Sequence, residues 1–344
     1  MSFSVGIVGL PNVGKSTLFK ALTRQPVDIA AYPFTTIHPN VGVVQIPDER
    51  LEKIAQVIKP EKVTPTIIEF VDIAGLVKGA HKGEGLGNQF LANIRNCDAI
   101  IEVVRGFEDP NVEHVTGEIN PEKDIEIVQV ELLMKDLETL ENALSKIEKE
   151  VKSKEKKALK KKELFDKVKD WVSQGKIIAE LELNDEEKSE LKEFQFLSAK
   201  PILYLLNTDT APESKKYSIQ LKMNLRDEVE VSELSAEEAK ELGIQPHLDQ
   251  LILACYNILD LITFYTVAGG KETRAWTLKK GGSASDAGGV VHTDFKEKFI
   301  RAEVIGWQKL IESGSWKNAR ETGQLKTVGR EHIIEDSDVI EFRI

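Results

Sequence analysis

The chain has 344 residues, a formal net charge of −11 and 41% hydrophobic residues. Because this length exceeds the span over which one hydrophobic core usually grows, we expect two or three modules. No apolar run approaches bilayer length and no leader precedes the first expected strand, so the sequence predicts a soluble, cytoplasmic protein with no membrane partner. The negative charge argues against a protein that coats nucleic acid, and DNA is not an expected partner, although a local basic surface could still meet RNA.

The chain has only two cysteines, Cys97 and Cys255. Two are too few for a disulfide framework, and their separation does not fit a metal site. We therefore expect buried thiols in a reducing compartment, and neither cysteine is an expected nucleophile.

The first candidate site follows a short apolar run at 5–8, where residues 9–16 read GLPNVGKS. This is the phosphate-binding pattern GxxxxGK[ST], and residues 17–22 behind it favour a helix. Glycines at both ends let backbone N–H groups turn toward phosphate oxygens, Lys15 adds charge at the outer phosphates, and Ser16 offers a hydroxyl to Mg²⁺. We predict a nucleoside triphosphate site with Lys15 as a catalytic residue and with nucleotide contacts from Asn12, Val13, Gly14, Lys15, Ser16 and Thr17.

Strand-like runs at 41–46, 66–71, 99–104 and 201–206 follow, with a helix-like stretch at 48–58. Strands interleaved with helices predict an α/β fold with a parallel, doubly wound sheet whose ligand lies beyond the carboxyl ends of the strands. The run at 66–71 ends in Asp72, and residues 72–75 fit the DxxG switch of guanine-nucleotide-type enzymes. Asp72 is therefore a predicted magnesium ligand, and Gly75 and Asn207 are predicted nucleotide-binding residues.

Between the runs at 99–104 and 201–206 the apolar period changes to 3.5, which indicates a helical insertion. The seam consists of Val130, Leu133, Leu137, Leu140, Leu144, Ile147 and Val151. A returning helix from Leu159 to Gly175 would complete an antiparallel coiled-coil hairpin. Residues 146–169 hold eleven lysines and five acidic residues, a local net charge of +6. Such lysines either contact phosphate or only solvate the helices, and the sequence leaves both readings open.

From residue 261 onward the pattern changes again, to short strand-like runs, paired glycines at 281–282 and 288–289, a helical stretch at 312–321 and a final strand at 339–344. This predicts a small separate α+β domain. Its thirteen basic and twelve acidic residues nearly cancel, so this domain gives no strong nucleic-acid signal.

Four motifs resemble the YchF, or Obg-like ATPase, family: GLPNVGKSTLF at 9–19, YPFTTI at 32–37, FVDIAGLVKGA at 70–80 and GEGLGNQFL at 83–91. RAWT at 274–277 and HTDF at 292–295 extend the resemblance to that family's C-terminal TGS domain, a β-grasp module. The resemblance covers nearly the whole chain. It implies a P-loop NTPase domain split between 1–118 and 198–260, the coiled-coil insertion at 119–197 and the TGS domain at 261–344.

The resemblance also implies a function. It indicates a translation-associated nucleotidase that hydrolyses ATP, in some members GTP, and meets the ribosome and its RNA through the accessory domains. A molecular switch that regulates translation or a stress response would follow, and we expect a monomer.

Nucleotide selectivity can be predicted from residues 207–210, which read NTDT. Guanine-specific relatives use NKxD, whose final Asp accepts two guanine N–H groups, but that position is Thr210 here and Asp209 lies one residue early. A site built on such bonds can discriminate by roughly four to five orders of magnitude. Strict GTP specificity is therefore not expected; the resemblance favours ATP, although the family usually has Glu at the position of Thr210. Asn207 could equally be a strand-end turn residue.

The attacking water needs a positioning group, because Leu76 stands where Ras-like enzymes have a glutamine. By resemblance, His114 matches a histidine that the family places in a mobile loop near the γ-phosphate, and it is the predicted catalytic residue. A loop histidine without a role is the alternative. His38 and His81, beside the two switches, are weaker candidates.

The resemblance also predicts the ligands of a metal site. The resemblance picks Thr36 over Thr35 as a magnesium ligand beside Ser16 and Asp72, and Asn12 occupies a position at which related enzymes recruit K⁺.

Two hypotheses on function remain. The first hypothesis is an ATP-hydrolysing switch, which the phosphate loop, Asp72 and Thr36 favour. The second is a mainly non-catalytic, nucleotide-dependent RNA- or ribosome-binding adaptor, which Leu76 favours.

Overall fold

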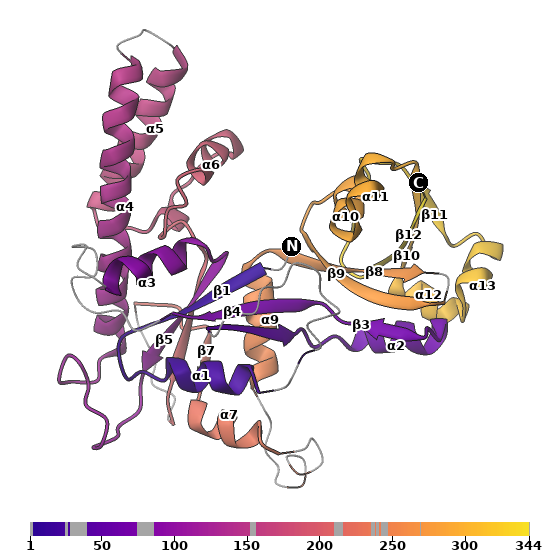
Figure 1. Cartoon of the computed structure of the whole chain (residues 1–344), viewed down its shortest axis with the longest axis horizontal. Coiled ribbons are helices and arrows are strands. Elements are labelled where there is room, and N and C mark those ends of the chain that lie inside the picture. Colours follow the sequence, from indigo (N-terminus) through magenta and orange to yellow (C-terminus); the bar gives the residue numbers. More distant parts are fainter. Residues whose placement is uncertain are drawn as a thin grey trace.

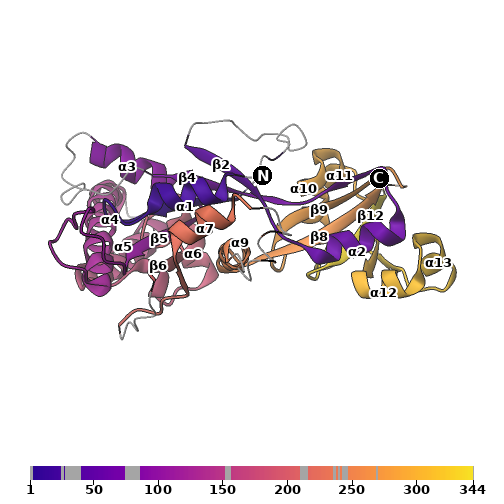
Figure 2. The same ribbon diagram turned by 90° about the horizontal axis from the view of Figure 1, so that it is seen from below.

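The computed structural model describes residues 3–24, 27, 40–73, 86–151, 156–209, 216–234, 238, 241, 247–268 and 270–343. In this part of the chain two six-stranded sheets lie at opposite ends of the molecule, and a pair of long helices projects beside the first sheet (Figures 1 and 2).

The first sheet carries the phosphate loop. Its strands, in spatial order, are β2 (Val41–Gln45), β4 (Ile67–Asp72), β1 (Phe3–Val8), β5 (Ala99–Arg105), β6 (Ile202–Asn207) and β7 (Leu221–Met223). All neighbours pair in parallel except β2, which is antiparallel to β4. The α/β prediction is confirmed, but the expectation of a wholly parallel sheet is wrong at this edge. An edge strand matches one neighbour only, so an antiparallel edge on a parallel sheet is common.

Helices cover this sheet. α1 (Lys15–Leu22) packs against β1, β2 and β4 and against α7 (Leu225–Val231), while α9 (Leu248–Ile258) packs against β5 and β6. α3 (Leu86–Arg95) is the next helix along the chain after β4 in the described residues. Every residue of β5 is buried, as expected for a central strand covered on both faces. The core therefore fixes the carboxyl ends of β1, β5 and β6, from which the site is built.

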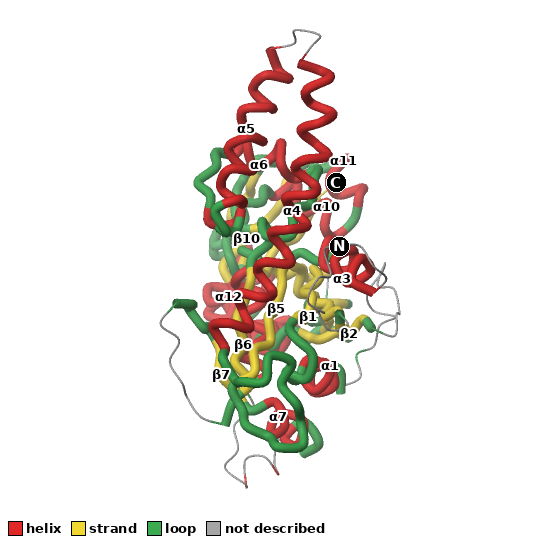
Figure 3. Tube along the Cα trace, turned by 90° about the vertical axis from the view of Figure 1, so that its left-hand side faces the viewer, coloured by secondary structure: helices red, strands yellow, loops and turns green. Residues whose placement is uncertain are grey.

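The projecting helices are α4 (Pro121–Val151) and α5 (Lys156–Ser173), which lie side by side (Figures 1 and 3). A short 3₁₀ turn, Ile178–Glu180, and α6 (Asp185–Lys192) return the chain to β6. We call α4 and α5 the arm. Its apolar seam consists of Leu133, Leu140, Ala143, Leu144, Ile147, Leu164, Phe165, Val168 and Val172.

Two residues expected in the helical hairpin's seam lie outside it, because Val130 is 52% exposed and Leu159 is 46% exposed. The first turns of α4 pack instead on the sheet, where they bury Ile125, Val128 and Leu132. The buried residues in these turns face the sheet and not α5. The 3.5-residue repeat of the coiled coil therefore does not extend to the start of α4.

A buried carboxylate fastens the arm to the sheet. Asp136 on α4 is fully buried and accepts hydrogen bonds from the backbone N–H groups of Leu197 and Ser198, both at 2.8 Å, and from the Ser198 hydroxyl at 2.6 Å. Because Leu197 and Ser198 precede β6, these bonds hold the base of the arm against the chain that enters the sheet.

The second sheet contains β11 (Lys326–Val328), β10 (Arg301–Gly306), β12 (Asp338–Arg343), β8 (Leu261–Ala268), β9 (Glu272–Lys279) and β3 (Lys62–Thr64), in that order. Its helices are α10 (Ala284–Val291), α11 (Thr293–Glu297), α12 (Trp307–Ser313) and α13 (Trp316–Glu321). The helical stretch expected at 312–321 is thus two helices, separated at Gly314, whose φ of 70° is left-handed.

The second sheet also recruits residues from the first third of the chain. β3 pairs with β9, and α2 (Glu49–Ile58) buries Leu51 and Ile54 against a cluster that includes Tyr265. At the start of α2, Asp48 accepts a 2.5 Å bond from the Tyr265 hydroxyl. Residues 48–64 therefore pack with the domain expected at 261–344, although the sequence assigns them to the nucleotide domain. No helix in the described ranges is both long and apolar enough to span a membrane.

Candidate functional site

The phosphate loop joins β1 to α1 and relies on left-handed backbone. Gly9, Asn12 and Gly14 have φ values of 146°, 63° and 109°. A Cβ atom at Gly9 would lie 2.4 Å from the Val103 carbonyl oxygen, and one at Gly14 would lie 2.5 Å from Asn207 Nδ2. Both glycines are therefore required by conformation and by space.

Lys15 is buried at the centre of this loop. Its Nζ donates a 2.7 Å hydrogen bond to the Leu10 carbonyl oxygen, which folds the side chain back over the loop. Burial lowers the pKa of Lys15 to about 8, against the opposing influence of Asp72. A partly desolvated ammonium gains from an anion placed beside it, so this arrangement is prepared for phosphate.

Ser16 and Asp72 meet at the carboxyl ends of β1 and β4. The Ser16 hydroxyl lies 3.5 Å from Asp72 Oδ2, and burial raises the pKa of Asp72, with Lys15 and Ser16 acting in the other direction. A hydroxyl and a carboxylate are hard oxygen donors suited to Mg²⁺. Among the described residues, no group of three or more His, Cys, Asp or Glu side chains is placed to hold a metal ion. Thr36 and Gly75 lie outside the described residues.

Asn207, at the end of β6, binds backbone on two sides. Its Nδ2 donates to the Val13 carbonyl oxygen at 3.0 Å, and its Oδ1 accepts from the Leu225 backbone N–H at 3.1 Å. The side chain thus ties the phosphate loop to the first turn of α7. In this structure the Asn207 side chain supports the phosphate loop, and its role as a direct nucleotide contact stays a prediction.

A cavity of about 310 Å³ lies beside the loop, at the lower end of the range for ligand pockets. Two bonds connect its walls: Arg226 Nη2 donates to Asp109 Oδ2 at 3.3 Å, and Asn224 Nδ2 donates to Asp209 Oδ1 at 2.5 Å. Asp209 is therefore engaged by the residue that caps α7. The lining also includes Phe107, Glu108, Val112 and Thr17, of which the sequence singled out only Thr17. Phe107 and Arg226 belong to no motif, so only the three-dimensional arrangement reveals them.

His114 lies next to the site, but its imidazole is turned away. Asn12 Nδ2 donates to the Glu113 carbonyl oxygen at 3.3 Å, which brings the backbone before His114 against the phosphate loop. The imidazole itself is buried, with Nε2 2.9 Å from Asp124 Oδ2 at the start of α4. His114 does not line the 310 Å³ cavity. His38, His81 and Leu76 lie outside the described residues, and K⁺ recruitment by Asn12 stays a prediction.

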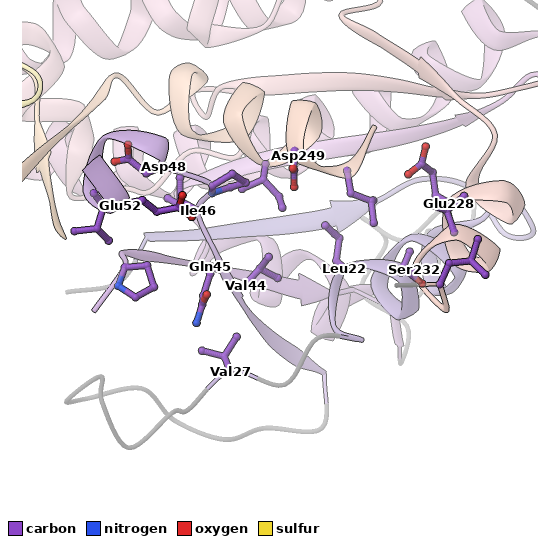
Figure 4. A pocket seen from close by; sticks show the side chains of 18 of the residues that line it. Leu22, Val27, Val44, Gln45, Ile46, Asp48, Glu52, Glu228, Ser232 and Asp249 are labelled. Atoms are coloured by element: carbon purple, nitrogen blue, oxygen red, sulfur yellow. The ribbon is translucent and has the colours of Figure 1, made fainter. Parts of the chain in front are cut away.

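A larger cavity, of about 490 Å³, lies elsewhere, between α1, β2, α2, α7 and α9 (Figure 4). None of residues 9–16 lines it, and its polar side chains include the carboxylates of Asp48, Glu52, Glu228 and Asp249. Asn12 and Gly14 of the phosphate loop line the smaller cavity, so the smaller cavity is the candidate nucleotide site.

Comparison with protein families gives two matches. Residues 4–153 match a family described as "50S ribosome-binding GTPase". Residues 261–344 match YchF-GTPase_C, which is described as a protein of unknown function.

Individual relatives match over the full chain. The "Ribosome-binding ATPase YchF" of Bacillus subtilis is 43% identical over 364 residues, covering 100% of this chain and 99% of the relative. The protein of that name from Escherichia coli O157:H7 is also 43% identical, with 99% of each chain covered. Among solved structures, the YchF GTPase of Schizosaccharomyces pombe has a TM-score of 0.86 at 32% identity and covers 99% of this chain and 98% of its own.

Proposed function

This chain belongs to the YchF family, and on that premise we propose that it is a Mg²⁺-dependent ATPase that associates with the ribosome. GTP would be a further substrate. The observation that carries the proposal is the complete phosphate loop, with Lys15 buried at its centre and with Ser16 and Asp72 side by side at its edge. A switch that acts in translation or a stress response, in the cytoplasm, would follow from this activity.

The chemistry of phosphoryl transfer assigns a role to each of these residues. Backbone N–H groups of residues 12–17 would bind the phosphate oxygens, and Lys15 would move from the Leu10 carbonyl to the outer phosphates. Ser16 and Asp72, with Thr36 from the first switch, would hold Mg²⁺, which neutralises charge on the outer phosphates. His114 would orient the water once its imidazole reaches the nucleotide.

The contacts of Asp209 argue against strict specificity for guanine. Recognition of guanine requires a free carboxylate that accepts two N–H groups from the base edge. Asp209 accepts instead from Asn224 Nδ2, and Thr210 offers no carboxylate. We therefore expect ATP to bind at least as tightly as GTP, and a hundredfold preference for GTP in a titration would overturn this expectation.

The arm is the proposed contact for ribosomal RNA. Several of its lysines form ion pairs, namely Lys161 with Glu190, Lys162 with Asp166, Lys167 with Glu187 and Lys169 with Glu141. Lys146 and Lys160 are exposed near the tip and have no ion-pair partner among the described residues. Phosphate contacts would therefore concentrate at the tip, because the paired lysines are already partly neutralised.

The adaptor hypothesis keeps one observation in its favour. Both ring nitrogens of His114 are engaged by protein groups, so in this conformation the imidazole cannot take the place of the Ras-like glutamine. Slow hydrolysis that a ribosome accelerates would reconcile both hypotheses. The test is ATP turnover with and without purified ribosomes; nucleotide binding without turnover in either condition would favour the adaptor.

A further inference from the structure

The loop at 111–118 connects the phosphate loop with the arm. Its backbone contacts the phosphate loop through Asn12 and the Glu113 carbonyl oxygen. The next residue, His114, directs its imidazole to Asp124 in the first turn of α4. A residue whose backbone adjoins the nucleotide site thus has its side chain bound to the base of the arm.

The hydrogen bonds of His114 define its tautomer. The backbone N–H of Thr116 can only donate, and it lies 3.2 Å from His114 Nδ1, so Nδ1 carries a lone pair. The Thr116 hydroxyl is also 2.9 Å from Nδ1 and 3.0 Å from the Glu118 carbonyl oxygen, and its single hydrogen can be donated to only one of them. The ring proton therefore lies on Nε2 and is donated to Asp124. Neither nitrogen is left to act on a water.

The His114–Asp124 bond is sealed from solvent, since the two side chains are only 5% and 3% exposed. Buried Glu102 and Arg105 on β5 lie near Asp124, and Lys123 and Glu118 are the charged groups on its solvent side. Within the described part of the chain, Asp124 Oδ1, Glu102 Oε2 and Arg105 Nη1 have no hydrogen-bond partner. A low-dielectric surrounding strengthens the bond that Asp124 makes to His114.

We propose that Asp124 is a positioning residue that withholds His114 from the nucleotide, so that hydrolysis requires the hydrogen bond between His114 and Asp124 to break. The inference rests on the proposed function, in which His114 orients the water. α4 runs without interruption from Asp124 to Lys146 near the tip, a distance of about 33 Å at 1.5 Å per residue. A ribosome that binds the tip can displace Asp124 through this helix and free the imidazole.

The direct test is Asp124→Asn, a substitution of the same shape that weakens the charge-assisted bond. We expect ATP turnover without ribosomes to rise about tenfold, with a smaller further stimulation by ribosomes. The double variant Asp124→Asn with His114→Ala should lose the gain. Turnover that stays unchanged or falls in folded Asp124→Asn, while ribosomes still stimulate the wild type, would overturn the inference alone.

Asp136→Asn is the matched control, because Asp136 lies on the same helix, is equally buried and accepts hydrogen bonds from Leu197 and Ser198, away from His114. We expect it to lower the melting temperature without raising turnover in the absence of ribosomes. An equal rise in both variants would mean that loosening the arm in general, and not release of His114, increases turnover, and would overturn the role of Asp124. Should Asp124→Asn fail to fold, Thr116→Val removes the hydroxyl contact to Nδ1 and should give a two- to threefold rise.

A second readout does not depend on hydrolysis. Nitrogen NMR of the His114 ring should find Nε2 protonated and Nδ1 unprotonated in the nucleotide-free wild type, and a mixture of tautomers in Asp124→Asn. A protonated Nδ1 in the wild type would overturn the proposed hydrogen-bond arrangement. If the NMR result is as expected but no variant hydrolyses ATP even with ribosomes, the proposed function has failed, and the role of Asp124 in catalysis fails with it.

Discussion

The phosphate loop and the loop that carries His114 touch through Asn12 and Glu113, but they are prepared to different degrees. The phosphate loop has its left-handed residues in place and Lys15 buried at its centre. The imidazole of His114 is instead bonded to the arm. The difference indicates that the backbone of the phosphate loop already has its binding shape, whereas under our proposal hydrolysis requires the release of His114 from Asp124.

The largest effect is expected for a substitution in the phosphate loop. Lys15→Ala should reduce ATP turnover by about 10² to 10³-fold, because it removes the charge that meets the outer phosphates. Steady-state kinetics and ATP titration would measure the loss. The melting temperature of the nucleotide-free protein should not fall, since the change removes a buried ammonium whose desolvation lowers its pKa to about 8. Near wild-type turnover would mean that this loop is not the catalytic one.

His114→Ala tests the loop whose imidazole is bonded to the arm. We expect kcat of the ribosome-stimulated reaction to fall about 10- to 100-fold with KM nearly unchanged, because a group that acts only in the transition state does not contribute to substrate binding. The reaction without ribosomes should change much less, since His114 is already withheld there. Equal losses in both reactions would remove the distinction between the two loops.

Under our proposal, the arm releases His114 when the lysines near its tip bind the ribosome. Neutralising Lys146 and Lys160 together should weaken ribosome association several-fold. The slope of log affinity against log salt should also become shallower, by about 0.7 to 0.9 for each phosphate group that these lysines neutralise in the wild type. Co-sedimentation over a salt series would measure both. The matched control neutralises Lys162 and Lys169, which are paired with Asp166 and Glu141. Equal effects from both pairs would indicate that overall charge, and not the tip, decides binding.

The smallest expected effect is on stability near Asp124. Burial raises the pKa of Glu102 well above its ordinary value of 4.5, so the folded state retains a proton that the unfolded chain releases. The stabilisation is present below about pH 4.5 and is lost as the pH rises through the raised pKa, by at most about 1.4 kcal/mol per pH unit. Denaturant titrations across this range should find a shallower decline in Glu102→Gln.

Part of this decline should remain in Glu102→Gln, because burial shifts the pKa of Asp124 in the same direction. A decline of the same slope in Glu102→Gln and in the wild type would contradict the assignment.

The phosphate loop could be predicted from sequence because its chemistry is local. Gly9, Gly14, Lys15 and Ser16 stand at fixed spacings that the backbone geometry requires, and the apolar run before Asp72 predicts a strand that ends beside them. The structure brings Ser16 within 3.5 Å of Asp72 because strand ends of a parallel sheet converge, while the role of these residues in nucleotide binding stays a prediction.

The rest of the fold depends on contacts between distant residues. The apolar face of residues 48–58 predicts a helix, but nothing local indicates that Leu51 and Ile54 pack with Tyr265 of the second sheet. The exposure of Val130 likewise follows from the packing of α4 on β5. The bond between His114 and Asp124 belongs to no motif, so the sequence could nominate the histidine but not its partner.

We propose that the protein hydrolyses ATP at the phosphate loop under control of the ribosome. The most direct measurement is ATP turnover by the wild type and by Lys15→Ala, each with and without purified ribosomes. We predict slow turnover by the free wild type, clear stimulation by ribosomes, and loss of both in Lys15→Ala. ATP binding that Lys15→Ala abolishes, with no turnover by the wild type in either condition, would contradict the claim and identify a nucleotide-dependent adaptor.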